Sequence, residues 1–174
     1  SARQFLQEDL LRMIEPAVEY SGLNPAMIDL EITESIAILN REYAISVMVR
    51  LQGMGIRICI DDFGTGHSSL ASLRDFPIHT VKIDRSFVRH FGERPNDVAL
   101  ASTIIAMAHD LSLTVAAEGV ETNEQFEFLK QAGCDVYQGF LLSKPIPPRG
   151  IEAMLRGCTG ADDEPQRTGT CTAC

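Results

Sequence analysis

Short apolar segments alternate with longer amphipathic segments along the chain, and this pattern restricts the fold more than any other feature. The apolar segments, which we predict to be strands, lie at residues 27–33, 56–60, 80–84, 114–117 and 136–140. The amphipathic segments, which we predict to be helices, lie at residues 6–20, 41–54, 68–74, 96–111, 122–133 and 150–156. Thr122 and Gln125 match the capping box that begins the fifth of these helices. Because such alternation forms a parallel sheet covered by helices, we predict an α/β fold, either a doubly wound open sheet or a TIM-type barrel.

The chain is long enough for one domain with a substantial core. Its 174 residues are 45 % hydrophobic, which is ordinary for a globular protein and excludes a wholly disordered chain. Residues 1–157 carry all the predicted strands and helices, so we assign them to one domain. Residues 158–174 are rich in Gly, Thr and Asp and have no apolar period, so we predict a disordered tail.

The charge and the cysteine content restrict the partners and the location. Fifteen Lys and Arg residues against twenty-four Asp and Glu residues give a formal net charge of −9, which argues against duplex nucleic acid as a partner. No apolar run approaches the ~20 residues that span a bilayer, so we expect no membrane contact by this segment. Five cysteines, an odd number without a disulfide pattern, favour a reducing cytoplasmic location.

Charged and polar side chains stand at or near the C-terminal end of every predicted strand. They are Glu31, Glu34, Asp61, Asp62, Lys82, Asp84, Glu118, Glu121 and Gln138. In a parallel α/β fold these strand ends point to one face, where such folds place their active sites. Carboxylates crowded on one face repel each other, and a divalent cation resolves the repulsion. Oxygen ligands without Cys or His favour Mg²⁺, Mn²⁺ or Ca²⁺ over Zn²⁺.

The residue chemistry leaves three classes of function open. The first is metal-assisted hydrolysis of a phosphate ester, in which one carboxylate of the Asp61–Asp62 pair bridges two ions ~3.5–4 Å apart. The second is enolate or Schiff-base chemistry with Lys82 as the base or nucleophile. The third is a non-catalytic ligand-binding domain. A single acid after a strand is more often a helix cap or a turn residue, but acids at successive strand ends favour a site.

Five motifs in one order identify a resemblance to a known family. They are Leu-Glu-Ile-Thr-Glu-Ser at 30–35, Asp-Asp-Phe-Gly-Thr-Gly at 61–66, Val-Lys-Ile-Asp at 81–84, Ala-Glu-Gly-Val-Glu at 117–121 and Gln-Gly at 138–139. Together they resemble the EAL-domain family of bacterial cyclic-di-GMP phosphodiesterases, from Ser1 to about Arg156. The resemblance implies a TIM-type (β/α)8 barrel that hydrolyses cyclic di-GMP to linear pGpG with two Mg²⁺ or Mn²⁺ ions.

The resemblance also implies roles for individual residues. The residues that look like metal ligands are Glu31, Asp61, Asp62 and Glu118, with Asp61 as the bridge. Lys82 resembles the catalytic residue that contacts the nucleophilic water, and Glu121 and Gln138 resemble the groups that hold water at the ions. A loop that couples the site to a dimer interface corresponds to Phe63, Gly64, Thr65 and Gly66, with Glu34 as the acid that anchors it. His67 stands in this loop where the family usually has Tyr.

The family's Glu-Ala-Leu motif, and an asparagine expected just before Ser1, do not occur in this sequence. Both supply metal ligands in the family. We therefore expect a C-terminal portion of an EAL barrel, incomplete with about five β/α units and inactive as a fragment. For the parent protein we expect cyclic di-GMP as substrate, a homodimer through the EAL domain, an upstream sensor or GGDEF domain, and a cytoplasmic site with or without a membrane anchor elsewhere. The alternative is a degenerate EAL domain that binds cyclic di-GMP or a protein partner without catalysis.

Overall fold

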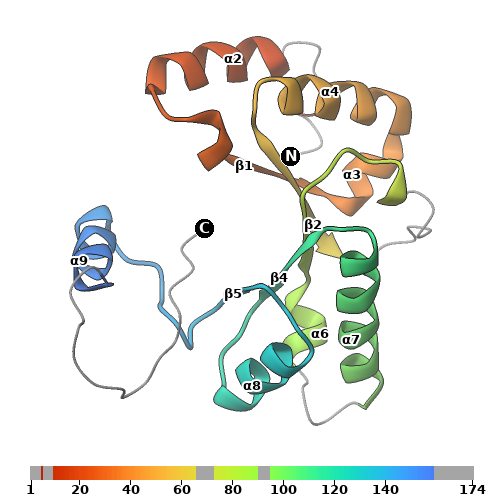
Figure 1. Cartoon of the computed structure of the whole chain (residues 1–174), viewed down its shortest axis with the longest axis vertical. Helices are drawn as coiled ribbons and strands as arrows, with labels where there is room; N and C mark the ends of the chain where they lie inside the picture. Colours follow the sequence, from red (N-terminus) through yellow and green to blue (C-terminus); the bar gives the residue numbers. More distant parts are fainter. Residues whose placement is uncertain (1–4, 6–9, 66–72, 90–94, 159–174) are drawn as a thin grey trace.

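The computed structural model describes Phe5 and residues 10–65, 73–89 and 95–158. These residues form a parallel sheet, and described helices separate β1 from β2, β3 from β4 and β4 from β5 (Figure 1). The elements are α2 (Leu10–Ser21), the 3₁₀ helix η1 (Pro25–Met27), β1 (Asp29–Thr33), α3 (Glu34–Leu39), α4 (Arg41–Gly53), β2 (Arg57–Phe63), β3 (Thr80–Ile83), α6 (Arg85–Arg89), α7 (Pro95–Asp110), β4 (Thr114–Glu118), α8 (Asn123–Gln131), β5 (Val136–Gln138) and α9 (Pro148–Cys158).

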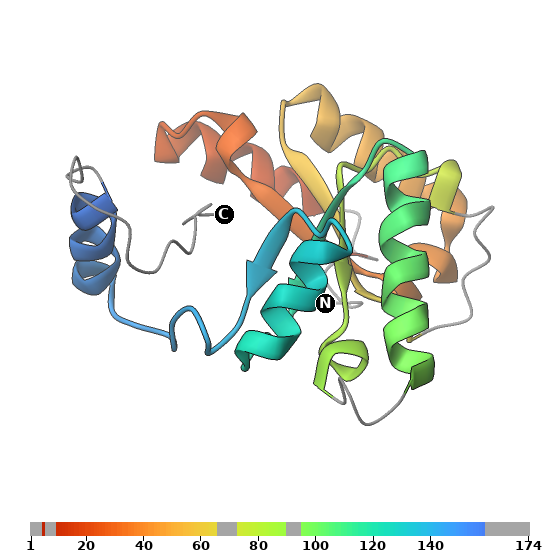
Figure 2. The same cartoon turned by 60° about the horizontal axis from the view of Figure 1, so that its bottom comes forward.

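The order of the strands decides between the two predicted architectures. The sheet runs β1-β2-β3-β4-β5, and every neighbouring pair is parallel. A doubly wound sheet reverses its order at a switch point, whereas barrel strands follow one another in chain order. The observed order is therefore that of a barrel. Helices α4 and α7 lie on the same side of the strands, and α9 stands away on the other side (Figures 1 and 2).

The two faces of the sheet have different side chains because successive residues of a strand point to opposite faces. One face carries buried apolar residues that form the core with the helices: Ile32, Ile58, Ile60, Val81, Ile83, Val115 and Ala117. The other face carries mostly polar side chains around a hollow of about 530 Å³, among them Asp29, Glu31, Cys59, Thr80, Lys82 and Gln138. In a barrel this second face is the interior, so the polar residues belong to the centre of the fold.

Most predicted elements are present, with differences at their ends. The strand predicted at 27–33 begins at Asp29, because η1 occupies the residues before it. Helices α3 and α6 were not expected from the sequence, since each spans fewer than two turns and shows no apolar period. The capping box of Thr122 and Gln125 is present at the start of α8. The loop helix expected at 68–74 falls largely outside the described residues, as does the tail after Cys158.

The last strand is shorter than predicted because of a close backbone approach at Gly139. A Cβ at this position would overlap the main chain of Val120. Val120 donates its N–H to the carbonyl of Gln138 at 3.1 Å and accepts from the N–H of Leu141 at 3.0 Å. The chain therefore leaves the sheet at Gly139 and wraps over the end of β4. None of the described helices combines the length and the apolarity needed to cross a membrane.

Candidate metal centre

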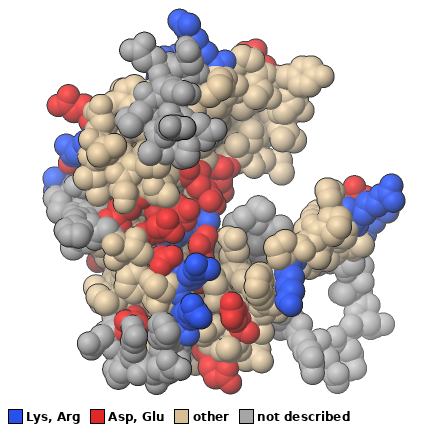
Figure 3. Space-filling view, turned by 180° about the vertical axis from the view of Figure 1, so that it is seen from behind, with Lys and Arg blue, Asp and Glu red and all other residues tan. Residues whose placement is uncertain are grey.

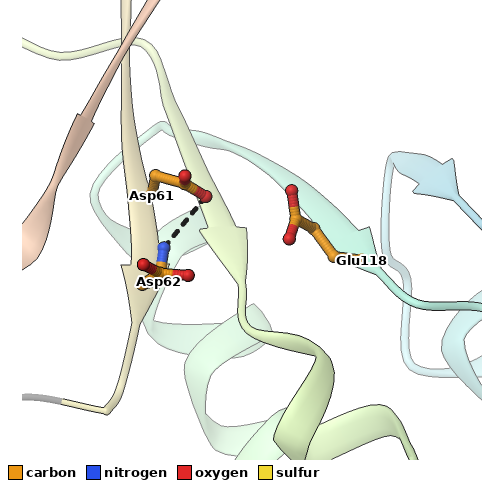
Figure 4. A group of neighbouring side chains, drawn as sticks. All are labelled: Asp61, Asp62 and Glu118. Carbon is orange, nitrogen blue, oxygen red and sulfur yellow. Dashed lines mark hydrogen bonds between the residues drawn. The ribbon is translucent and has the colours of Figure 1, made fainter. Parts of the chain in front are cut away.

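Three carboxylates meet at the C-terminal ends of β2 and β4. Asp61 and Asp62 come from β2 and Glu118 from β4, and one ligand oxygen from each lies within 4.8 Å of the others (Figure 4). Asp61 and Glu118 point toward one another across β3. The ends of β2 and β4 therefore bring these three acids together.

Asp61 and Asp62 both reach this cluster although adjacent residues of a regular strand point to opposite faces. The register of β2 against β3 shifts between Ile60 and Phe63, and Asp62 has a φ of +54°. The N–H of Asp62 donates to Oδ1 of Asp61 at 3.0 Å. A non-glycine residue in the left-handed region is strained, and such strain is typical of functional sites. This irregularity turns two consecutive acids toward the same side of β2, where Glu118 also lies.

Lys82 of β3 is the cation within this group of acids. Its side chain is 8 % exposed, and its Nζ donates to Oε1 of Glu31 at 2.8 Å. The same Nζ pairs with Glu118 and lies 3.6 Å from Oδ1 of Asp61. Carboxylates from β1, β2 and β4 therefore converge on one buried ammonium group from β3.

The surroundings of Lys82 determine its protonation. Burial by itself lowers the pKa of this amine, but the hydrogen bonds to Glu118 and Glu31 outweigh the burial and raise the pKa above its ordinary value. The amine therefore stays protonated near neutral pH. A Schiff-base or enolate mechanism needs a neutral lysine, so the second class of function is disfavoured.

The cluster fits a hard divalent cation. Burial, and next the charge of Asp61, raise the pKa of Asp62, so a bound cation would relieve unfavourable charge there. The donors are carboxylate oxygens without Cys or His, which is the set that Mg²⁺ and Mn²⁺ prefer. Asp61, Asp62 and Glu118 would hold such an ion. Glu31, which the sequence predicts as a ligand, lies on the same face and pairs with Lys82, but it is not in this group of three.

Glu121 and Gln138 lie beside Glu118, one of the three acids. Together with Glu118 they line a second hollow of about 500 Å³. Gln138 also lines the hollow on the inner face of the sheet that contains Glu31 and Lys82. Acidic side chains gather in the middle of one face of the molecule, with basic side chains beside them (Figure 3). Gln138 therefore joins the hollow that contains Glu31 and Lys82 to the hollow that contains Glu118 and Glu121.

The segment after β2 is anchored as expected. Glu34 is 3 % exposed, and its Oε2 accepts from the N–H of Gly64 at 2.9 Å. The hydroxyl of Thr65 donates to the carbonyl of Asp62 at 2.8 Å. Phe63 is buried in the core, and Gly66 lies outside the described residues. The contact of Glu34 with Gly64 joins the start of α3 to the segment that carries Asp61 and Asp62.

Residues 1–145 match the family model of the EAL domain. The chain belongs to the EAL domain family. The resemblance inferred from the five motifs is confirmed, and with it the fold as an incomplete TIM-type barrel, of which five parallel strands are described.

The EAL relatives with known names are signalling proteins. The chain is 46% identical over 155 residues to the signaling protein YkoW of Bacillus subtilis and 42% identical over 147 residues to the cyclic di-GMP phosphodiesterase NbdA of Pseudomonas aeruginosa. These matches cover 89% and 84% of this chain, but it spans only 19% of the length of each relative.

Solved EAL structures have the same arrangement. A c-di-GMP complex of the PaMucR phosphodiesterase is 40% identical with a TM-score of 0.84, over 87% of this chain and 61% of that one. The BlrP1 protein of Klebsiella pneumoniae, solved with manganese and cyclic di-GMP, is 32% identical with a TM-score of 0.75, over 82% of this chain and 36% of that one.

Gln125, which the sequence predicts only as a helix cap, also contacts helix α6 and the segment that carries Glu121. Its Oε1 accepts from the N–H of Glu121 at 2.7 Å. Its Nε2 donates to the carbonyl of Val88 at 3.1 Å, a contact across 37 residues of sequence. A capping box needs only an acceptor at this position, which Glu would also supply. The side-chain NH₂ of Gln125 is therefore the one feature of the sequence that suggests a second hydrogen-bond partner.

Proposed function

We propose that this chain forms the C-terminal part of an EAL phosphodiesterase that hydrolyses cyclic di-GMP to linear pGpG with Mg²⁺ or Mn²⁺. The observation that carries the proposal is the convergence of Glu31, Asp61 and Glu118 on Lys82 from neighbouring strands. NbdA and PaMucR, whose names describe phosphodiesterases, support cyclic di-GMP as the substrate. The chain spans about a fifth of its curated relatives, so the activity is proposed for the protein that contains it.

We propose two ions, which Asp61, Asp62, Glu118 and Glu31 would hold. Such ions neutralise the phosphodiester and lower the pKa of water toward neutrality. Glu31 accepts a hydrogen bond from the ammonium of Lys82. To bind an ion, the carboxylate of Glu31 would have to give up part of this contact. The manganese complex of BlrP1 supports the choice of metal.

Lys82 acts as a hydrogen-bond donor in this proposal. Its ammonium stays charged and is fixed by carboxylates of three strands. It therefore orients an oxygen of the attacking water or of the phosphate rather than accepting a proton. Glu121 and Gln138, which border the second hollow with Glu118, position water next to the acids.

We further propose a homodimer, coupled to the site by the segment from Phe63 to Gly66. The bond from Gly64 to buried Glu34 supports the coupling role of this segment, because it ties the residues that follow Asp61 and Asp62 to the start of α3. A cytoplasmic location and an upstream sensor or GGDEF domain also belong to the proposal. MucR of Pseudomonas aeruginosa, named a bifunctional diguanylate cyclase/cyclic di-GMP phosphodiesterase, supports the GGDEF partner.

A chimera tests the activity. Residues 1–145 would replace the matching segment of the PaMucR phosphodiesterase, and release of pGpG would be followed with Mn²⁺. Because an EAL structure is also known with cAMP and with cGMP, these nucleotides serve as comparison substrates. We expect turnover of cyclic di-GMP that Asp61→Asn abolishes and Asp75→Asn, in an exposed ion pair with Arg41, leaves unchanged. Binding of cyclic di-GMP without turnover would favour the degenerate EAL domain instead.

A further inference from the structure

We propose that Gln125 is a positioning residue of the EAL site, whose side-chain amide fixes the loop between Glu118 and Thr122 onto helix α6. The catalytic consequence rests on the proposed function, but the structural role does not. Gln125 is 6 % exposed, one of four buried polar or charged residues among those described. Its amide lies between two segments that each follow a strand of the site.

The oxygen of the amide holds the loop after β4. Oε1 of Gln125 accepts from the N–H of Glu121 at 2.7 Å and from the N–H of Thr122 at 3.0 Å. One side-chain oxygen therefore satisfies two consecutive backbone donors. The main chain of Glu121 is fixed by this contact three residues after Glu118.

The nitrogen of the amide ties the same loop to α6. Nε2 of Gln125 donates to the carbonyl of Val88 at 3.1 Å, and Val88 is fully buried. Helix α6 follows β3, the strand that carries Lys82. A helix cap is complete without this second bond, so the amide nitrogen has a role beyond capping.

The other side of the loop is already fixed by different contacts. Val120 donates to the carbonyl of Gln138 at 3.1 Å, and Gly119 packs so closely on Arg85 that a Cβ there would lie 2.7 Å from the Cβ of Arg85. Gln125 supplies the bonds at Glu121 and Thr122, the far end of the loop. Together these contacts hold Glu118 and Glu121 in one position relative to β3. Small displacements of catalytic groups reduce rates strongly, so such support matters at this loop.

The test uses the full 174-residue chain and three variants. Gln125→Met keeps the shape but removes both polar atoms. Gln125→Glu keeps the acceptor for Glu121 and Thr122 and removes the donor to Val88. Gln131→Met, at the exposed end of the same helix, is the matched control. Amide hydrogen exchange and Mn²⁺ affinity, measured by electron paramagnetic resonance, are the two readouts.

We expect Gln125→Met to speed exchange of the Glu121 and Thr122 amides about tenfold and to weaken Mn²⁺ binding about tenfold. Gln125→Glu should restore protection at Glu121, and Gln131→Met should change neither readout. Unchanged exchange in Gln125→Met, or unchanged Mn²⁺ affinity where the parent chain binds Mn²⁺, would overturn the inference. A parent chain that binds no Mn²⁺ would contradict the metal centre of the proposed function. In that case the exchange rate of the Glu121 amide would by itself decide whether Gln125 fixes the loop. If Gln125→Met does not fold, protection of Glu121 in Gln125→Glu gives the same decision.

Discussion

The ammonium of Lys82 donates to Oε1 of Glu31 at 2.8 Å, although the two residues are 51 positions apart in the chain. This bond crosses from β3 to β1, over the inner face of β2. The intervening strand adds Asp61 to the same ammonium, and β4 adds Glu118. A buried lysine therefore organises acids from three strands, and a divalent ion would compete with it for the same oxygens.

Replacing Lys82 by Met should expose the repulsion among these acids. Removing one partner of a buried charged group leaves uncompensated charges, so we expect a loss of about 3 kcal/mol in the free energy of unfolding. Urea unfolding with a chelator measures the loss, and Mn²⁺ should restore part of it. Lys130→Met removes an exposed lysine on α8 and should change stability by less than about 0.5 kcal/mol. Equal stability of the two variants would contradict the role given to Lys82.

The strands and their polar ends could be predicted from the sequence because both signals are local. Ile56, Ile58, Cys59 and Ile60 form a short apolar segment that contains one charged residue, Arg57, and Asp61 and Asp62 follow this segment directly. The left-handed conformation of Asp62 could not be predicted, because it depends on a register shift against a strand about twenty residues later. The second bond of Gln125 was missed for the same reason, since its partner Val88 lies in another element.

Gly139→Ala should destabilise the end of the sheet. The added Cβ would overlap the backbone of Val120, which cannot move without breaking its bonds to Gln138 and Leu141. We expect a loss of about 3 kcal/mol in the free energy of unfolding. Gly53→Ala is the control, because a Cβ there meets no atom within 4 Å. Alanine in a helix should raise the free energy of unfolding by up to about 1 kcal/mol relative to glycine. A Gly139→Ala protein as stable as the parent chain would contradict the close backbone contact between Gly139 and Val120.

Glu34→Ala should release the segment after β2. It removes the acceptor for the N–H of Gly64, and the loss of a hydrogen bond to a charged group costs about 1.5–3 kcal/mol. Amide exchange at Gly64 should become faster, while exchange in α7 stays unchanged. Glu34→Gln keeps an acceptor oxygen and should preserve most of the protection. Equal exchange at Gly64 in Glu34→Ala and the parent chain would argue against anchoring by Glu34.

The buried thiol of Cys134 should be unreactive in the native chain. Burial raises its pKa to about 12, so almost no thiolate is present near pH 8. Because the folded chain binds this proton more tightly than the unfolded chain, the thiol's contribution to stability is full below its ordinary pKa and is lost as the pH rises toward 12. The reactivity of Cys134 is measured by thiol labelling of a variant in which the other four cysteines, at positions 59, 158, 171 and 174, are replaced by Ser. Labelling at the rate of the denatured chain would contradict the burial of Cys134.

The most direct test of the metal centre is a Mn²⁺ titration of the full chain, followed by electron paramagnetic resonance at neutral pH. We expect saturable binding that weakens at least tenfold in Asp61→Asn and in Glu118→Gln. Asp75→Asn, which removes an exposed acid paired with Arg41, should bind Mn²⁺ like the parent chain. Equal Mn²⁺ affinity in all four proteins would contradict the central claim that acids from neighbouring strands form one cation site.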